Sequence, residues 1–262
     1  MNTKLCSPVL YQLRIGEDVI ELNDYLHKKV EFKFTGNIFC IQCGRKTKKS
    51  FQQGFCFPCL QRLQECNLCM IHPERCTVEH GTCPKDDWAH SQCYAESIVY
   101  LANSSAIKVG ITRCTNIPSR WIDQGATQAL PIYKVQNRHQ VGLIEVALKE
   151  HVADKTNWRV MLKGSADSID LVAERDRIID AAEDALTAIY DEYEDGEIEF
   201  LDEEPVEINY PVNVYPEKIK SLSLDKTPIV TGVLQGIKGQ YIYLDSGVMN
   251  IRKFGGYEVE FQ

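Results

Sequence analysis

The fold of this chain is decided around residues 40–59, which read CIQCGRKTKKSFQQGFCFPC. Two Cys-x2-Cys pairs, Cys40/Cys43 and Cys56/Cys59, are separated by twelve residues. Each pair bends the backbone so that two thiolates converge, and the intervening hairpin brings the pairs opposite each other. This spacing predicts a four-coordinate zinc site rather than a disulfide cluster, because paired Cys-x2-Cys motifs are poor disulfide scaffolds.

More thiols follow directly in the sequence. Cys66-x2-Cys69 is a third pair and predicts a second zinc site. Cys76, Cys83 and Cys93 compete for its two remaining places, and a neighbouring histidine could displace any of them. A site closed by four protein ligands has no open coordination position, so both zinc ions would be structural. The candidate metal ligands are therefore Cys40, Cys43, Cys56, Cys59, Cys66, Cys69, Cys76, Cys83 and Cys93.

The compartment follows from the cysteine usage. The chain has 11 cysteines, an odd number, and most of them are clustered. Residues 1–9 lack the charged and apolar regions of a secretory signal, and no stretch approaches the roughly 18 apolar residues of a membrane span. We therefore expect a cytoplasmic protein with reduced thiols and no membrane association.

The net charge of −8 conceals a division of the chain. Residues 1–165 carry 21 Lys and Arg against 15 Asp and Glu, a net charge of +6, whereas residues 166–262 carry 8 against 22, a net charge of −14. A DNA or RNA surface is therefore expected in the first 165 residues, unless their positive charge is only a solvated surface. The acidic part could contact a basic protein partner or support a homodimer.

Hydrophobic periodicity predicts an α+β fold. Residues 29–34 alternate with a period of two, as in a half-buried strand, and residues 169–190 carry an amphipathic stripe typical of one helix. Five segments are expected: a β-meander at 1–39, a zinc-binding region with two sites at 40–95, a small αβ unit at 96–165, an acidic helix and linker at 166–205, and a small β unit at 206–262.

The αβ unit has a distinct order of elements. Apolar runs at 98–102 and 106–111 flank turn residues and predict a hairpin. Pro118 opens a short helix that ends at Gly125. A third strand at 130–135 and a helix at 140–151 follow.

Residues 99–157 resemble the GIY-YIG nuclease superfamily. Val99-Tyr100-Leu101 stands at the first tripeptide of that family's motif, and Lys108-Val109-Gly110-Ile111-Thr112 stands at the second. The resemblance places the family's arginine, glutamate and asparagine at three later positions. It thus implies a phosphodiesterase site made of Tyr100, Lys108, Arg120, Glu145 and Asn157.

The resemblance also implies a mechanism. Glu145 would hold Mg²⁺ or Mn²⁺, Arg120 would bind phosphate oxygens, and Tyr100 would position or deprotonate the attacking water. Lys108 replaces the family's second tyrosine, as in some branches of the superfamily. A lysine there could stabilise phosphate charge or mark a site that binds without cutting.

Three functions remain open from the sequence: a metal-dependent endonuclease, a zinc-stabilised nucleic-acid-binding protein that does not cut, and a zinc-dependent assembly module. The whole chain also resembles an uncharacterised bacterial family that couples a cysteine-rich segment to two motifs, Lys108-Val109-Gly110-Ile111-Thr112 and Arg120-Trp121-Ile122-Asp123-Gln124-Gly125-Ala126. The cations expected to line a nucleic-acid groove are Arg113, Lys134, Arg138, Lys155 and Arg159.

Overall fold

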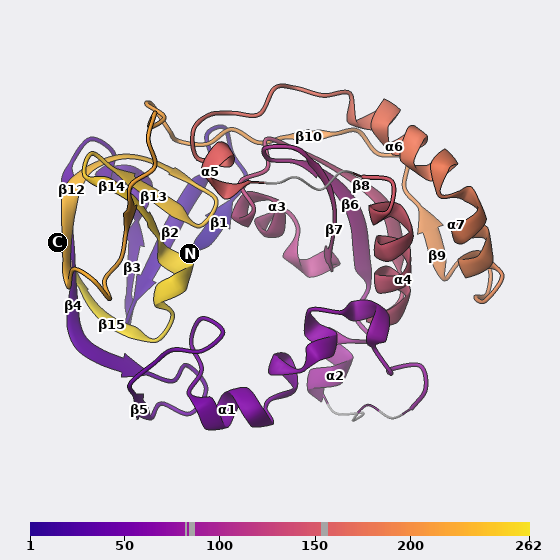
Figure 1. Ribbon diagram of the computed structural model, residues 1–262, viewed down its shortest axis with the longest axis horizontal. Helices are drawn as coiled ribbons and strands as arrows, with labels where there is room; N and C mark the ends of the chain where they lie inside the picture. The colour runs from indigo at the N-terminus through magenta and orange to yellow at the C-terminus, as the bar shows by residue number, and fades with distance from the viewer. Residues whose placement is uncertain (82, 84–86, 153–156) are drawn as a thin grey trace.

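The computed structural model describes residues 1–81, 83, 87–152 and 157–262. It shows two sheet-containing parts joined by the cysteine-rich segment (Figure 1). The predicted α+β fold class is confirmed. In the part of the chain that the structure describes, no helix is long and apolar enough to cross a membrane.

The β lobe combines the two ends of the chain. Its small antiparallel sheet has the order β1-β2-β3, and its larger sheet has the order β11-β14-β13-β12-β4-β15, with β5 paired to β4. The strands are β1 (Asn2–Lys4), β2 (Leu10–Ile15), β3 (Asp18–Glu21), β4 (Lys29–Phe39), β5 (Lys46–Thr47), β11 (Ser221–Leu222), β12 (Ile229–Lys238), β13 (Tyr241–Leu244), β14 (Gly247–Asn250) and β15 (Tyr257–Phe261).

Strand β4 connects the N-terminal part of the β lobe to its C-terminal part, because it lies between β12 and β15 and is antiparallel to both. Its alternating residues Val30 and Phe32 are buried in a core shared with residues of the C-terminal strands. The Phe32 ring centre lies 5.0 Å from that of Phe261. The N-terminal and C-terminal β segments therefore pack as one body.

The αβ unit is built on a third sheet, which is antiparallel and has the order β10-β8-β6-β7 with β9 paired to β8. The predicted order of hairpin, helix, strand and helix is present. The elements are β6 (Ser97–Asn103), β7 (Ile107–Arg113), α3 (Ser119–Asp123), β8 (Gln128–Val135), α4 (Arg138–Lys149), α5 (Trp158–Met161), α6 (Leu171–Ala181), α7 (Glu183–Tyr190), β9 (Ile198–Phe200) and β10 (Val206–Glu207).

Strand β6 is buried on both faces. Tyr100 and its same-face neighbours belong to the core shared with the β lobe, whereas Val99 and Leu101 belong to the core beneath α4, α6 and α7. This division follows from the alternation of side chains along a strand. The sheet thus separates two cores, and the Tyr100 side chain and α4 lie on opposite sides of it.

The prediction of one continuous helix at 169–190 was wrong, because this segment forms two separate helices, α6 and α7. Ala182 lies between them with φ −100° and ψ 9°, outside the regular helical region. The break allows Ile178 and Leu186 to enter the same core. Packing against a curved sheet therefore decides where this amphipathic segment bends.

The cysteine-rich segment connects the β lobe to the αβ unit and consists of short helical turns (Figure 1). They are α1 (Phe57–Arg62), η2 (Gln64–Cys66), η3 (Leu68–Met70), η4 (Pro73–Arg75) and α2 (Asp87–Gln92). Turn η4 packs on α4 at Gly142, where an added Cβ would lie 2.5 Å from the carbonyl carbon of Pro73. The glycine is therefore needed for this close approach.

Lys238, at the end of β12, is fully buried. Its Nζ donates a hydrogen bond to the Gly164 carbonyl oxygen at 2.9 Å and lies 5.4 Å from the ring centres of both Tyr210 and Tyr215. Among the described residues, no carboxylate forms an ion pair with it. Burial lowers the pKa of Lys238 to about 8.

Stability is expected to rise with pH because of Lys238. Its pKa falls from 10.5 to about 8 on folding, so above pH 7 the native state binds fewer protons than the unfolded state. This one group should raise the free energy of unfolding by about 1 kcal/mol between pH 7 and pH 9. Denaturant unfolding at both pH values should show this rise in the wild type and not in Lys238→Met. Exposed Lys226→Met is the control and should behave as the wild type; the same pH dependence in Lys238→Met would contradict the argument.

Candidate metal centre and neighbouring αβ site

The sulfur atoms of Cys40, Cys43, Cys56 and Cys59 all lie within 4.8 Å of one another. The Cys43 and Cys56 sulfur atoms are 3.8 Å apart. Zinc–sulfur bonds of about 2.3 Å in a tetrahedron would separate two sulfur atoms by about 3.8 Å. The four cysteines are thus positioned to bind one metal ion, and the ligand set suits zinc. Four ligands close the site, which makes such an ion structural.

The local backbone positions these thiols and favours their metal-binding form. Cys40 continues from β4, and Gly44 adopts a φ of +68°, which the tight turn after the first pair requires. Burial alone would raise the pKa of Cys40, but hydrogen bonds from nearby backbone groups of Cys43, Cys56 and Gln42 lower it to about 6. Those hydrogen bonds favour the thiolate, which is the form that binds a metal.

Cys59 has the opposite pKa shift. Burial and hydrogen bonds with the other three thiols raise its pKa to about 12. Without a metal, therefore, a proton is retained within the cluster, because several adjacent thiolates would repel one another. Metal binding would displace this proton and make metal affinity depend on pH.

The later cysteines are arranged less tightly. Cys76 and Cys93 are buried and share a hydrogen bond between their thiols. In the described ranges, no second group of three or more such ligand atoms lies within 4.8 Å of one another. Burial raises the pKa of the Cys66 thiol, and the charges of Glu65 and Cys40 add to this rise.

Tyr100 is fully buried, and its ring lies against Gly110, where an added Cβ would be 2.6 Å from the phenolic ring carbon. Within the described part of the chain, its hydroxyl makes no hydrogen bond of normal geometry. Burial raises the pKa of Tyr100, and the nearby Arg120 and Gln124 side chains offset this only in part. In this arrangement the phenol is therefore not activated as a base.

Glu145 lies on α4 and is 9% exposed. Its Oε1 forms an ion pair with Lys149 Nζ at 2.9 Å, one helical turn further along. The charge of Glu145 acts on Tyr100, although α4 packs on the face of the sheet opposite to the Tyr100 side chain. The structure thus brings Tyr100 next to Arg120 and leaves Glu145 paired with a lysine.

The other two residues of the GIY-YIG resemblance are Lys108, which pairs with Ala102 two positions along from the Tyr100–Gly110 pair, and Asn157, directly before α5. Lys108 is half-buried on β7. Asn157 is exposed, and its side chain caps α5 by accepting a hydrogen bond from the Arg159 backbone N–H at 2.9 Å. Its own backbone N–H donates to Ser105 Oγ at 2.9 Å.

Three of the cations predicted for a nucleic-acid groove make contacts within the protein. The Arg138 guanidinium donates to the Cys69 and Met70 carbonyl oxygens, Arg113 donates to the Ser91 carbonyl oxygen, and Lys134 pairs with Glu96. Arg159 is exposed and lies 4.4 Å from the Trp158 ring centre. Lys155 lies outside the described residues.

Sequence reasoning missed the acidic residue Glu79. One of its oxygens lies 2.7 Å from His139 Nδ1 and accepts a hydrogen bond from the Tyr193 hydroxyl at 3.1 Å, and the other accepts from Asn137 Nδ2 at 2.7 Å. Glu79 therefore ties the cysteine-rich segment to the start of α4 and to the acidic linker. As a loop residue outside any periodic pattern, it gave no signal in the sequence.

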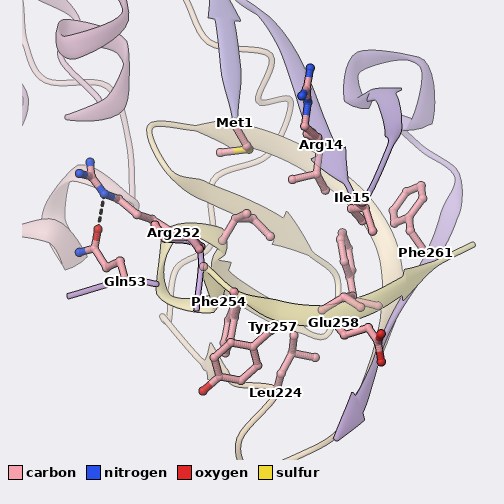
Figure 2. Close-up of a pocket in the computed structure, with 18 of the residues that line it drawn as sticks. Met1, Arg14, Ile15, Gln53, Leu224, Arg252, Phe254, Tyr257, Glu258 and Phe261 are labelled. Atoms are coloured by element: carbon pink, nitrogen blue, oxygen red, sulfur yellow. Dashed lines mark hydrogen bonds between the residues drawn. The ribbon is translucent and has the colours of Figure 1, made fainter. Parts of the chain in front are cut away.

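A large cavity of roughly 1390 Å³ opens in the β lobe (Figure 2). Its apolar wall includes Phe254 and Phe261. Figure 2 shows the Arg252 side chain donating a hydrogen bond to the side chain of Gln53, which belongs to the hairpin between the two cysteine pairs. Tyr100, Arg120 and Glu145 are not among its lining residues. The cavity therefore belongs to the junction of the metal centre with the β lobe, and Asp123 at the end of α3 also lines it.

The fold and the cysteine cluster define the chain as an α+β protein with a candidate structural metal centre between a β lobe and an αβ unit. A family model described as "Protein of unknown function (DUF2797)" matches residues 27–259, and the chain belongs to this family. The match extends from just before β4 into β15. Comparisons with curated proteins and with solved structures found no match.

Proposed function

We propose that this protein binds nucleic acid through the hairpin of its first metal centre. The observation that carries the proposal is the exposure of four cations in that hairpin: Arg45, Lys46, Lys48 and Lys49. Residues 40–59 contain no acidic residue. A zinc ion with four thiolates carries a charge of about −2, so the metal-bound hairpin would keep a net positive charge. Cations held on a rigid hairpin can contact successive phosphates.

An exposed aromatic side chain adds to this surface. Phe57, between the cysteines of the second pair, is 51% exposed. Aromatic rings next to cations are the usual means of stacking unpaired bases. This feature favours single-stranded DNA or RNA over a duplex as the ligand.

Binding should be measured by fluorescence anisotropy with labelled single- and double-stranded DNA and RNA over a range of salt concentrations. The triple variant Lys46→Ser/Lys48→Ser/Lys49→Ser should bind at least about tenfold more weakly, with a salt slope reduced by about 2–3. The control Lys218→Ser/Lys220→Ser/Lys226→Ser removes three exposed lysines from the acidic part of the chain. Equal losses in both triple variants, or no binding by the wild type, would refute the proposal.

Hydrolysis of phosphodiesters by the αβ unit is a second candidate function. The observation that favours it is the closeness of Arg120 to the Tyr100 hydroxyl, with the Glu145 charge acting on the same group. A divalent cation would have to displace Lys149 from Glu145. It would take its remaining ligands from water and phosphate oxygens, as Mg²⁺ commonly does. Arg120 would then hold the phosphate, and Tyr100 would orient the water.

Cleavage of the same substrates with Mg²⁺ or Mn²⁺ tests this second candidate. Glu145→Gln and Tyr100→Phe should each reduce cutting by about a hundredfold or more while retaining zinc. Glu150→Gln, an exposed acid just beyond α4, is the matched control and should cut normally. Wild-type activity in Glu145→Gln would exclude this site, and binding without cutting by the wild type would leave only the first candidate.

We also propose that the later cysteines hold a second structural zinc ion. The support is the buried, hydrogen-bonded pair Cys76 and Cys93, which provides half of a four-thiolate site.

A further inference from the structure

Two buried thiols from distant parts of the cysteine-rich segment meet beside α4. Cys76 is 2% exposed and Cys93 is 3% exposed, and both pack with Val78. Both are free cysteines, and their thiols share a hydrogen bond. A small apolar cluster of this kind contributes little folding free energy, so a metal ion is the usual means of holding such a segment together.

Cys83 lies next to this pair. Its Sγ is 3.3 Å from Thr77 Oγ1, which belongs to the residue following Cys76. The charge of Cys83 acts on Cys93 and on Cys69. Cys83 therefore lies beside the buried pair, and its sulfur would move closer to the other two on binding an ion as the third ligand.

Arg138 links the backbone of Cys69 to that of Cys93. The Arg138 guanidinium donates to the Cys69 carbonyl oxygen at 3.1 and 3.2 Å, while its backbone N–H donates to the Cys93 carbonyl oxygen at 2.8 Å. One arginine thus joins the backbones of two cysteines that are far apart in the sequence. The charges of Cys76 and Cys83 both act on the Cys69 thiol.

Cys66 belongs elsewhere, although it forms the sequence motif with Cys69. The charged groups that act on its thiol are Glu65 and Cys40, and Cys40 belongs to the first centre. That centre already has four ligands. The cysteine charges that act on Cys66 and on Cys69 thus come from different groups of thiols.

We infer that Cys69, Cys76, Cys83 and Cys93 bind a second structural zinc ion, and that Cys66 does not. The ion replaces the protons of the thiols, which leave to solvent, and four thiolates close its coordination. Arg138 lies beside the centre and offsets its negative charge. Because Arg138 is also the first residue of α4, the ion fixes the start of that helix. The inference rests on the proposed second zinc ion and is independent of nucleic-acid binding and cutting.

The test is the zinc content of the full-length chain, measured by mass spectrometry of the metal together with the absorption spectrum of the cobalt-substituted protein. The wild type and Cys66→Ser should each hold two ions with the intense bands of four-thiolate cobalt. Cys69→Ser and Cys83→Ser should each lose the second ion and keep the first. These variants replace partly exposed residues, which favours their recovery as folded proteins.

Two results would overturn the inference in distinguishable ways. One ion in the wild type would refute the second zinc ion itself. Two ions in the wild type, with one ion lost in Cys66→Ser and none lost in Cys83→Ser, would keep the second ion and refute the assigned ligands. If Cys69→Ser fails to fold, the cobalt spectra of the wild type, Cys66→Ser and Cys83→Ser still decide between these results.

Discussion

Removing the metal from the centre at Cys40, Cys43, Cys56 and Cys59 should lower the unfolding temperature by about 10 °C or more. Structural zinc sites of this kind contribute about 10–16 kcal/mol of binding free energy, which is folding free energy for the segment that holds the ion. A net loss of about 4 kcal/mol would shift the midpoint of a protein of this size by roughly 8–16 °C. We expect this result for Cys56→Ser and for the wild type treated with a strong chelator.

The effect should spread beyond the hairpin because the hairpin packs on the β lobe. Ser50 Oγ donates to the Gly255 carbonyl oxygen at 2.9 Å, and the backbone of Gln53 lies so close to Gly255 that no Cβ would fit there. Gly255 lies in the turn directly before β15. Hydrogen exchange should therefore increase in β15 as well as in residues 40–59.

Cys6→Ser is the matched control for this prediction, because Cys6 is a partly buried cysteine outside both groups. It should keep its metal and melt within a few degrees of the wild type. If the chelated protein, shown to be free of zinc, melts at the wild-type temperature, the centre is not part of the folding free energy.

Gly142→Ala should destabilise the protein by about 3 kcal/mol, even though alanine is the better helix former. An added Cβ on α4 would collide with the backbone of Pro73 and Glu74, and backbone atoms cannot move aside as a flexible side chain can. Turn η4 would have to leave the helix, which would also strain the contact of Arg138 with Cys69. Denaturant unfolding monitored by circular dichroism measures the loss.

Gly164→Ala is the control for this substitution, because nothing lies within 4 Å of a Cβ added there and its φ is not in the left-handed region. It should leave the stability unchanged or raise it slightly. An increase in stability of about 0.5–1 kcal/mol in Gly142→Ala, as helix propensity alone predicts, would show that η4 does not pack as described.

The sequence by itself determined the features that depend on short-range spacing. Two Cys-x2-Cys pairs twelve residues apart define the first metal centre because a hairpin of that length brings them together. Likewise, the hairpin, helix, strand and helix of the αβ unit follow from local periodicity and turn residues. The alternation in β6 also assigns its residues to two faces, which is a local property of any strand.

Only the tertiary structure decided which distant segments meet. Pairing of β4 with β12 and β15 joins residues about two hundred positions apart, and period-two patterns do not specify a partner strand. The same holds for the burial of Lys238 and for Arg138, whose hydrogen bonds join the backbones of Cys69 and Cys93. The sequence identifies Lys238 and Arg138 as cations, but tertiary packing decides which groups they contact. Local spacing therefore predicts a metal centre, and long-range packing decides which of the remaining thiols, such as Cys76 and Cys93, come together.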